Sequence, residues 1–502
     1  MTATYRYLGR RPRWLGIGLA VSSSACAIGM AASASANPFE LFGASSRSSS
    51  LGQAVTARVD DWSALWHNPG GLGLSQPHIS MGALLTFDDT RVRLKARPAG
   101  YEIPDLGDGS PVIPSKYRLS PPSGTDDLEN IYSFTLGAVG SFGLENLRVA
   151  VAVALPMNRL GRQASHFGDE REQYASNRLG FELLGERSQH QVILLGVGYR
   201  LLPWLSAGAA MSVMPSGKAV SSVYLADATQ QKNVDIAVNN DQIGQAEPIF
   251  GVTAQPTDRL RLGVSYRAAN WFGLDLENRI QIKGFQSDSS SFPVVQRVGM
   301  VLNYSPAQLA VGMAGQWQKL TLSIDAAYSR WSLYRDTQGH AVGEANGSSR
   351  PGSGFRDVVS VRSGLEYQAS ADRKVRAGLQ WEPTPIPDQV GRSNYVDNDR
   401  LVGSAGASHL LDLLGKPVEI AWHVGIHHLV ARDTNKAALA SYPTCAAGVA
   451  QLCDELPDDT KDPATGLPTA AATGLQTGNP GFPGWISAGT LLTVGMDLKW
   501  AF

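Results

Sequence analysis

The sequence lacks a long hydrophobic run beyond its first three dozen residues. No later stretch reaches the 18 or so uninterrupted apolar residues that a membrane-spanning helix needs, which excludes a helical membrane protein. Charged residues make up only 17% of the 502-residue chain, glycine is frequent at 53 residues, and the mean hydropathy is -0.12. Hydrophobic residues are therefore plentiful but dispersed, which also argues against a disordered chain.

Cysteine is also scarce. Besides one cysteine near the amino terminus, only Cys445 and Cys453 are present, close together in a stretch rich in proline, alanine and threonine. In an exported protein we expect these two thiols to form a local disulfide. They lack histidine or carboxylate neighbours at the spacing of a tetrahedral zinc set, so we expect no metal there.

The first 36 residues have the pattern of a secretory signal peptide. A basic region with four arginines precedes an apolar region at 14–30, and Ala34-Ser35-Ala36 forms a small-residue cleavage site. A twin-arginine signal and a lipoprotein signal at Cys26 fit the flanking residues less well. Removal of the leader leaves 39 basic and 44 acidic side chains. For such a mildly acidic exported chain we expect no nucleic-acid partner.

From about residue 76 onward, apolar and polar residues alternate with a period of two, which is typical of strands with two different faces. In the final stretch the apolar face carries Leu492, Val494, Met496, Leu498, Trp500 and Phe502. A soluble β-sandwich shows the same alternation. Aromatic residues at segment ends, alternating short and long connections, and an aromatic-ended last strand favour a transmembrane barrel instead. Lipid then requires closure, because an open edge would bury unpaired amides and carbonyls.

Fourteen such segments can be counted, which predicts an all-β, 14-stranded antiparallel barrel over residues 76–502. An even count places both termini in the periplasm, with the long connections outside the cell. This puts Cys445 and Cys453 in an outer loop. The predicted strands are 76–87, 129–142, 147–157, 188–201, 205–217, 248–256, 259–271, 294–317, 319–334, 356–368, 373–382, 400–410, 417–430 and 489–502. The predicted outer connections are 88–128, 158–187, 218–247, 335–355, 383–399 and 431–488.

Residues 37–75 alternate too weakly for a strand, and their alanine and tryptophan content favours short helical turns. A barrel with a polar lumen leaks unless something fills it. We therefore expect this segment to be a plug inside the barrel.

Three stretches resemble the FadL family of outer-membrane transporters for long-chain fatty acids and other hydrophobic compounds. GASSRSSSLGQAVTARVDDWSALWHNPGGLG (43–73) resembles the family's N-terminal hatch, whose signature is Asn-Pro-Ala. Asn68 and Pro69 match that signature, and Gly70 departs from its alanine. The other two stretches are LSIDAAYSRWSLY (322–334) and VRAGLQWEPTPIPD followed by DNDRLVGSAG (375–406). Together the likeness runs over nearly the whole mature chain.

The resemblance implies passive uptake of fatty acids or hydrocarbons, by capture among the outer loops, movement of the hatch and lateral release through the wall. It implies no cofactor, no energy source and no enzymatic step. Outer-membrane lipid, lipopolysaccharide and the barrel-assembly machinery are the expected surroundings of the protein, which we expect to be a monomer in the outer membrane.

Four groups of residues are candidates for specific roles. Asn68, Pro69 and Gly70 are predicted to fix a bend in the hatch, since proline biases the preceding residue away from helix, and Gly70 should loosen gating. Pro156 cannot donate to a ladder, so it marks either a gap in the wall or merely the end of its strand. Inward charges pair with each other or meet a ligand headgroup; the candidates are Arg267, Asp325, Arg362, Glu366 and Arg376. Finally, His423, His427 and His428 suggest either hydrated lumen side chains or, less readily, a metal site.

Two other functions remain open at this point. A general diffusion porin would have an open lumen without a plug. An outer-membrane lipid hydrolase would need a serine or threonine nucleophile with a histidine and an orienting group. No Gly-x-Ser-x-Gly elbow is present in the sequence.

Overall fold

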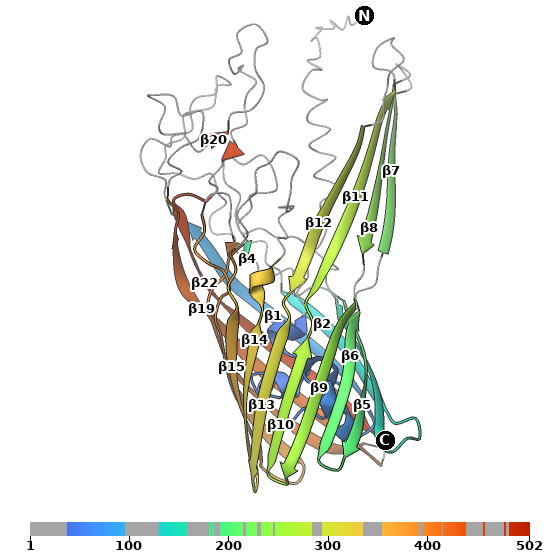
Figure 1. Cartoon of the computed structure of the whole chain (residues 1–502), viewed down its shortest axis with the longest axis vertical. Helices are drawn as coiled ribbons and strands as arrows, with labels where there is room; N and C mark the ends of the chain where they lie inside the picture. Colours follow the sequence, from blue (N-terminus) through green and yellow to red (C-terminus); the bar gives the residue numbers. More distant parts are fainter. Residues whose placement is uncertain are drawn as a thin grey trace, which may run out of the picture.

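In the computed structural model, fourteen antiparallel strands of the described residues form a closed barrel, with β22 paired to β1 (Figure 1). This confirms the predicted barrel and its strand number. In order around the barrel the strands are β1 (His78–Leu94), β2 (Ile131–Gly140), β3 (Leu147–Pro156), β5 (Val192–Leu202), β6 (Leu205–Val213), β9 (Ala246–Thr257), β10 (Leu260–Arg267), β13 (Gln308–Trp317), β14 (Leu320–Ser329), β15 (Val358–Gln368), β16 (Arg373–Glu382), β18 (Arg400–Leu413), β19 (Lys416–Asn435) and β22 (Gly484–Ala501). The structure describes residues 38–95, 130–157, 180–181, 183–184, 191–213, 217–227, 232–243, 246–283, 294–334, 354–390, 395–413, 415–437, 455–456, 476–477 and 481–502.

The outward face of the barrel is apolar, as the alternation predicts. On β14, Leu320, Leu322 and Ile324 are exposed, whereas Thr321, Ser323 and Asp325 between them are buried in the lumen. A contiguous exposed apolar band of this kind is unfavourable in water and favourable in hydrocarbon. The described residues contain no helix that is long and apolar enough to cross a membrane.

Short connections at one end of the barrel alternate with long ones at the other, as predicted. Neighbouring strands at the short end are joined across residues 203–204, 258–259 and 318–319, for example. The predicted strand 294–317 is wrong, because it is two strands. Its first half, β12 (Val294–Ser305), leaves the barrel, and only β13 belongs to the wall.

A four-stranded antiparallel sheet stands beyond the long-loop end of the barrel (Figure 1). The sequence interpretation missed it, since it treated 218–247 as a loop. The alternation of Val234, Ile236 and Val238 was a usable signal for a strand there. The sheet has the order β12, β11 (Asn270–Lys283), β8 (Lys232–Ile243) and β7 (Gly217–Asp227).

Smaller elements lie among the outer connections. They are the parallel pair β4 (Gly180–Phe181) and β17 (Tyr395–Val396), the antiparallel pair β20 (Glu455–Leu456) and β21 (Gln476–Thr477), and the 3-10 helix η4 (Trp331–Leu333). The predicted signal peptide at 1–36 and the predicted Cys445–Cys453 disulfide lie outside the described residues.

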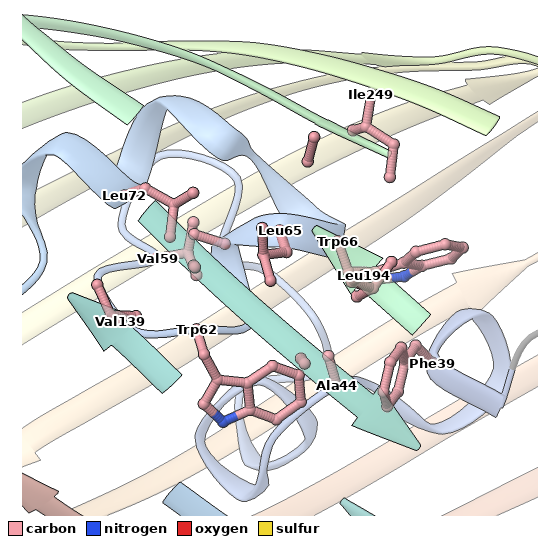
Figure 2. Close-up of a cluster of buried hydrophobic side chains, with 14 of the residues drawn as sticks. Phe39, Ala44, Val59, Trp62, Leu65, Trp66, Leu72, Val139, Leu194 and Ile249 are labelled. Atoms are coloured by element: carbon pink, nitrogen blue, oxygen red, sulfur yellow. The ribbon is translucent and has the colours of Figure 1, made fainter. Parts of the chain in front are cut away.

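Residues 38–75, which we call the N-terminal segment, lie inside the barrel as four short helices. One side of the segment is apolar: Phe39, Trp62, Leu65, Trp66 and Leu72 pack against the inner wall at Val139, Leu194 and Ile249 (Figure 2). Small residues of β3 and β6 complete this wall. The opposite wall, from β14 to β22, presents charged and polar side chains. The helices are α2 (Pro38–Phe42), α3 (Ser46–Ser50), α4 (Ala64–His67) and the 3-10 helix η1 (Pro69–Leu74).

Candidate functional site

The bend at Asn68 fastens the N-terminal segment to the barrel wall. Asn68 is fully buried and extended (φ -164, ψ 100) between α4 and η1, and its Oδ1 accepts a hydrogen bond from the Gly70 amide at 3.0 Å. Its Nδ2 donates to the carbonyl of Thr56 (2.7 Å), the carbonyl of Val252 (3.1 Å) and Oγ1 of Thr253 (3.1 Å). One side chain thus joins two parts of the segment to β9.

Glycines allow the segment to approach this wall closely. A Cβ on Gly70 would lie 2.8 Å from the backbone of Val252 and Thr253, and a Cβ on Gly251 would lie 2.0 Å from Oδ1 of Asn68. The alanine of the family signature would therefore push the segment away from β9. Gly70 provides tight packing here, so the looser gating that we inferred from the sequence has no support in this geometry.

Polar side chains of the opposite wall bind the backbone of the segment. Oδ2 of Asp325 on β14 accepts from the Thr56 amide at 2.8 Å, and Asp497 on β22 accepts from the Ser46 amide. Oγ of Ser404 on β18 accepts from the Gly52 amide and donates to the Ser50 carbonyl, both at 3.1 Å. The bonds to the Ser46 amide and the Ser50 carbonyl satisfy backbone groups at the two ends of α3, and the other two hold the turns that follow it.

A chain of ion pairs continues from the segment into the short-loop end of the lumen. Arg47 pairs with Asp60 within the segment and, through Nε, with Glu366 on β15 at 3.5 Å. Glu366 also accepts from Nε of Arg376 at 2.7 Å, and Arg376 reaches Glu419 at 3.6 Å. The sequence interpretation did not single out Arg47 or Asp60, because their partners depend on how the segment threads the barrel.

The three arginines predicted as headgroup contacts all face the lumen, and two of them, Arg267 and Arg376, form ion pairs with carboxylates. Arg267 lies between Glu40 (3.4 Å) and Glu247 (3.3 Å), with its guanidinium 3.9 Å from the ring centre of Trp66. Arg362 is the direct cross-strand neighbour of Asp325 and, with Arg267 and His67, lines a small polar cavity beside the segment. Arg376 belongs to the ion-pair chain. Contact of any of them with a ligand stays a prediction.

An apolar cleft lies above the N-terminal segment, where β15, β16, β18 and β19 reach the long-loop end. This cleft, the upper pocket, is partly open to solvent. Its apolar lining comes from Leu41, Leu183, Leu184, Trp331, Val358, Pro383, Pro385 and Leu429. Aromatic residues extend one side of it, where the rings of Tyr334 and Phe355 stack at 4.0 Å. The pocket is concave and mostly apolar with a few polar groups, as small-molecule sites are.

The polar groups of the upper pocket are mainly carboxylates. Glu382 pairs with Arg400, its direct neighbour across β16 and β18, and also accepts from Nε2 of Gln380 at 3.0 Å. Asp397, in the connection before β18, accepts from Oγ1 of Thr384. Burial raises the pKa of Asp397 to about 7. The sequence interpretation missed Glu382 and Arg400, although they end one predicted strand and begin the next.

Pro156 lies at the last position of β3. β3 pairs with β2 up to Pro156 and with β5 up to Ala154, and the Met157 amide still donates to the Tyr132 carbonyl at 2.7 Å. Both ladders are therefore continuous over Val149–Ala154. A gap in the wall stays a prediction, and it concerns the outer end of β3 rather than its middle.

The histidines of β19 divide between its two faces. His423 and His427 are buried in the lumen, where the His427 ring meets Phe42 of the N-terminal segment edge-on at 5.5 Å, and His428 faces outward. Within the described ranges, no group of three or more His, Cys, Asp or Glu side chains is placed to hold a metal ion.

The chain is similar to known transport proteins of the outer membrane. The family model described as outer membrane protein transport protein (OMPP1/FadL/TodX) matches residues 185–447, just over half of the chain. Alkane uptake protein A of Marinobacter nauticus is 30% identical over 139 residues, which cover 26% of this chain and only 30% of that protein.

Two crystal structures share the fold. A FadL homologue of Pseudomonas aeruginosa has a TM-score of 0.56 at 13% identity, covering 91% of this chain and 98% of that one. The toluene transporter TodX of Pseudomonas putida has a TM-score of 0.51 at 12% identity, covering 92% and 99%. With the barrel, its N-terminal segment and the family match in agreement, this protein belongs to the OMPP1/FadL/TodX family.

Proposed function

We propose that this protein takes up hydrophobic compounds across the outer membrane by passive transport, with the N-terminal segment acting as a hatch. The observation that carries the proposal is the upper pocket, an apolar cleft at the long-loop end of the lumen that has the N-terminal segment as its floor. Such a pocket provides an apolar environment for a hydrophobic molecule, which the polar lipopolysaccharide surface does not provide.

The lower lumen supports a sideways exit. Beneath the upper pocket the lumen contains the N-terminal segment and the ion pairs of Arg47, Glu366, Arg376 and Glu419. Passage of an apolar molecule through these charges would separate them without replacing their partners, which is costly. Release through the wall into the bilayer avoids that cost, and the outer end of β3 at Pro156 is where we place it.

The relatives support the substrate class. One similar protein is named for alkane uptake and one similar structure for toluene transport. The filled lumen favours this function over the alternative of a general diffusion porin, which needs an open aqueous path. The alternative of an outer-membrane lipid hydrolase is not supported by any of the side-chain contacts described above.

The test is uptake of radiolabelled naphthalene by cells that carry the protein in their outer membrane, compared with cells that lack it. We expect faster initial uptake with the protein. We also expect Asn68→Ala to reduce that gain by roughly tenfold, since it removes the hydrogen bonds that hold the hatch against β9, and a tenfold effect requires a loss of about 1.4 kcal/mol. The matched control is Ser75→Ala, which removes a single bond to the Gly71 carbonyl. Surface expression of both variants is measured by antibody binding.

Equal uptake with and without the wild-type protein would contradict the proposed function. If a normally expressed Asn68→Ala variant takes up naphthalene at the wild-type rate, the Asn68 bend contributes to packing only and has no role in the hatch.

A further inference from the structure

The charged side chains that line the upper pocket indicate whether it can bind an anionic ligand. Its charged lining consists of three carboxylates, Glu40, Glu382 and Asp397, and a single cation, Arg400. A pocket for a fatty-acid anion should present the opposite balance, because a carboxylate headgroup is stabilised by an unpaired arginine or lysine.

Arg400 is already neutralised. Its guanidinium pairs with Glu382, and the Arg400 side chain is only 6% exposed. Nη1 of Arg400 has no hydrogen-bond partner among the described residues. That nitrogen offers a donor to a neutral oxygen, but the ion pair as a whole offers no net positive charge to an anion.

The other arginines near the pocket also lie beside acidic side chains. Arg267 forms ion pairs with Glu40 and Glu247, and Arg362, which has no ion pair with the described residues, has Asp325 as its cross-strand neighbour. In the described part of the upper lumen, Arg267, Arg362 and Arg400 thus lie among five acidic side chains: Glu40, Glu247, Asp325, Glu382 and Asp397. Each of the three arginines has an acidic neighbour that competes with a ligand carboxylate.

The burial of Asp397 indicates that negative charge is unfavourable in the upper pocket. It is 6% exposed, and burial raises its pKa to about 7 although Arg400 is nearby. Since desolvation makes the ionised form of this carboxyl unfavourable, a ligand carboxylate bound beside it would meet a similar cost.

We infer that the upper pocket admits uncharged hydrophobic molecules and rejects carboxylates. Glu382 sets this preference, because its ion pair with Arg400 balances the positive charge that would otherwise bind a ligand carboxylate. The inference rests on the proposed function, because it concerns the substrate class of the same pocket. Asp397 adds to the preference through its position on the pocket lining. The substrates that fit are hydrocarbons or their neutral derivatives, rather than fatty-acid anions.

A matched pair of ligands tests the inference directly. Naphthalene and 2-naphthoate share one ring system and differ by a carboxylate that is ionised at neutral pH. Saturable binding of each is measured by equilibrium dialysis against the full mature protein in nanodiscs, with empty nanodiscs as background. We expect the wild-type protein to prefer naphthalene by about tenfold or more, an effect of about 1.4 kcal/mol.

Glu382→Gln is the decisive variant, because it leaves Arg400 with an unpaired charge. We expect the ratio of naphthoate to naphthalene affinity to rise by about tenfold or more, and the double variant Glu382→Gln/Arg400→Gln to lose that rise. Asp388→Asn is the matched control, since Asp388 also pairs with an arginine, Arg432 at 3.2 Å, but is exposed and lies outside the pocket lining. This control should leave the ratio unchanged.

Each outcome is decisive. Equal wild-type affinities for the two ligands would overturn the inference while leaving the proposed function intact. An unchanged ratio in a folded Glu382→Gln variant would overturn the role of Glu382. If the wild-type protein binds neither ligand, the proposed function fails and this inference fails with it. Heat-modifiable migration on gels establishes that each variant is a folded barrel, and Asp397→Asn, with a smaller rise expected, serves as the second variant if Glu382→Gln does not fold.

Discussion

Gly251→Val should open the lumen to small hydrophilic solutes. A Cβ at this position would lie 2.0 Å from Oδ1 of Asn68 and 2.9 Å from Pro69, so the N-terminal segment cannot keep its seat on β9. Displacement of the segment breaks the two hydrogen bonds that Asn68 donates to β9, at about 1 kcal/mol each. We expect the rate of sugar entry into proteoliposomes to rise by about tenfold or more.

Gly403→Val is the matched control for this variant. It makes the same substitution in a barrel strand, but its Cβ has a single neighbour within 4 Å, a methyl of Leu379 at 4.0 Å. It should leave sugar entry at the wild-type rate. Slow sugar entry into proteoliposomes with correctly inserted Gly251→Val protein would show that the N-terminal segment does not close the lumen.

Arg47→Glu should release the N-terminal segment from its ion pairs. Arg47 is the partner of both Asp60 and Glu366, so the reversal brings three carboxylates together in the lumen. Breaking a buried pair in this way costs about 3–5 kcal/mol. Trypsin cleavage after Arg58, followed by mass spectrometry, should accelerate by about a hundredfold, because cleavage follows the population of the released segment.

Arg373→Glu makes the same charge change at an exposed pair, where Arg373 and Asp372 have 67% and 44% exposed side chains. It should leave cleavage after Arg58 unchanged, since surface ion pairs contribute little. Cleavage of the Arg47→Glu protein at the wild-type rate would mean that the ion pairs do not hold the segment.

The barrel could be predicted from the sequence because lipid imposes one rule on every wall strand. A residue that faces hydrocarbon must be apolar, and the next residue along the strand faces the lumen. Alternation therefore marks strands as far apart as β14 and β22. Each of the fourteen predicted segments overlaps one barrel strand.

The outer sheet escaped prediction for a related reason. Its strands alternate as the wall strands do, so β12 and β13 together look like one overlong segment. Pro306, which falls between them, was the available signal for a boundary, since proline is excluded from the interior of a paired strand.

The site could be predicted only in part. The Asn68–Pro69 bend and the inward position of Arg267, Arg362 and Arg376 follow from local sequence. Their partners do not, because Asn68 binds Val252 and Thr253, which lie 184 and 185 positions away along the chain. Glu382 and Arg400 are the exception. They become cross-strand neighbours as soon as the segments 373–382 and 400–410 are paired as a hairpin.

The central claim is that the N-terminal segment fills the lumen of a barrel that admits hydrophobic molecules but not water-soluble ones. The most direct test is the single-channel conductance of the unmodified mature protein in a planar lipid bilayer. We predict insertion without conductance steps of porin size. Regular nanosiemens steps from the unmodified protein would contradict the account, because they would require an open aqueous path past the segment.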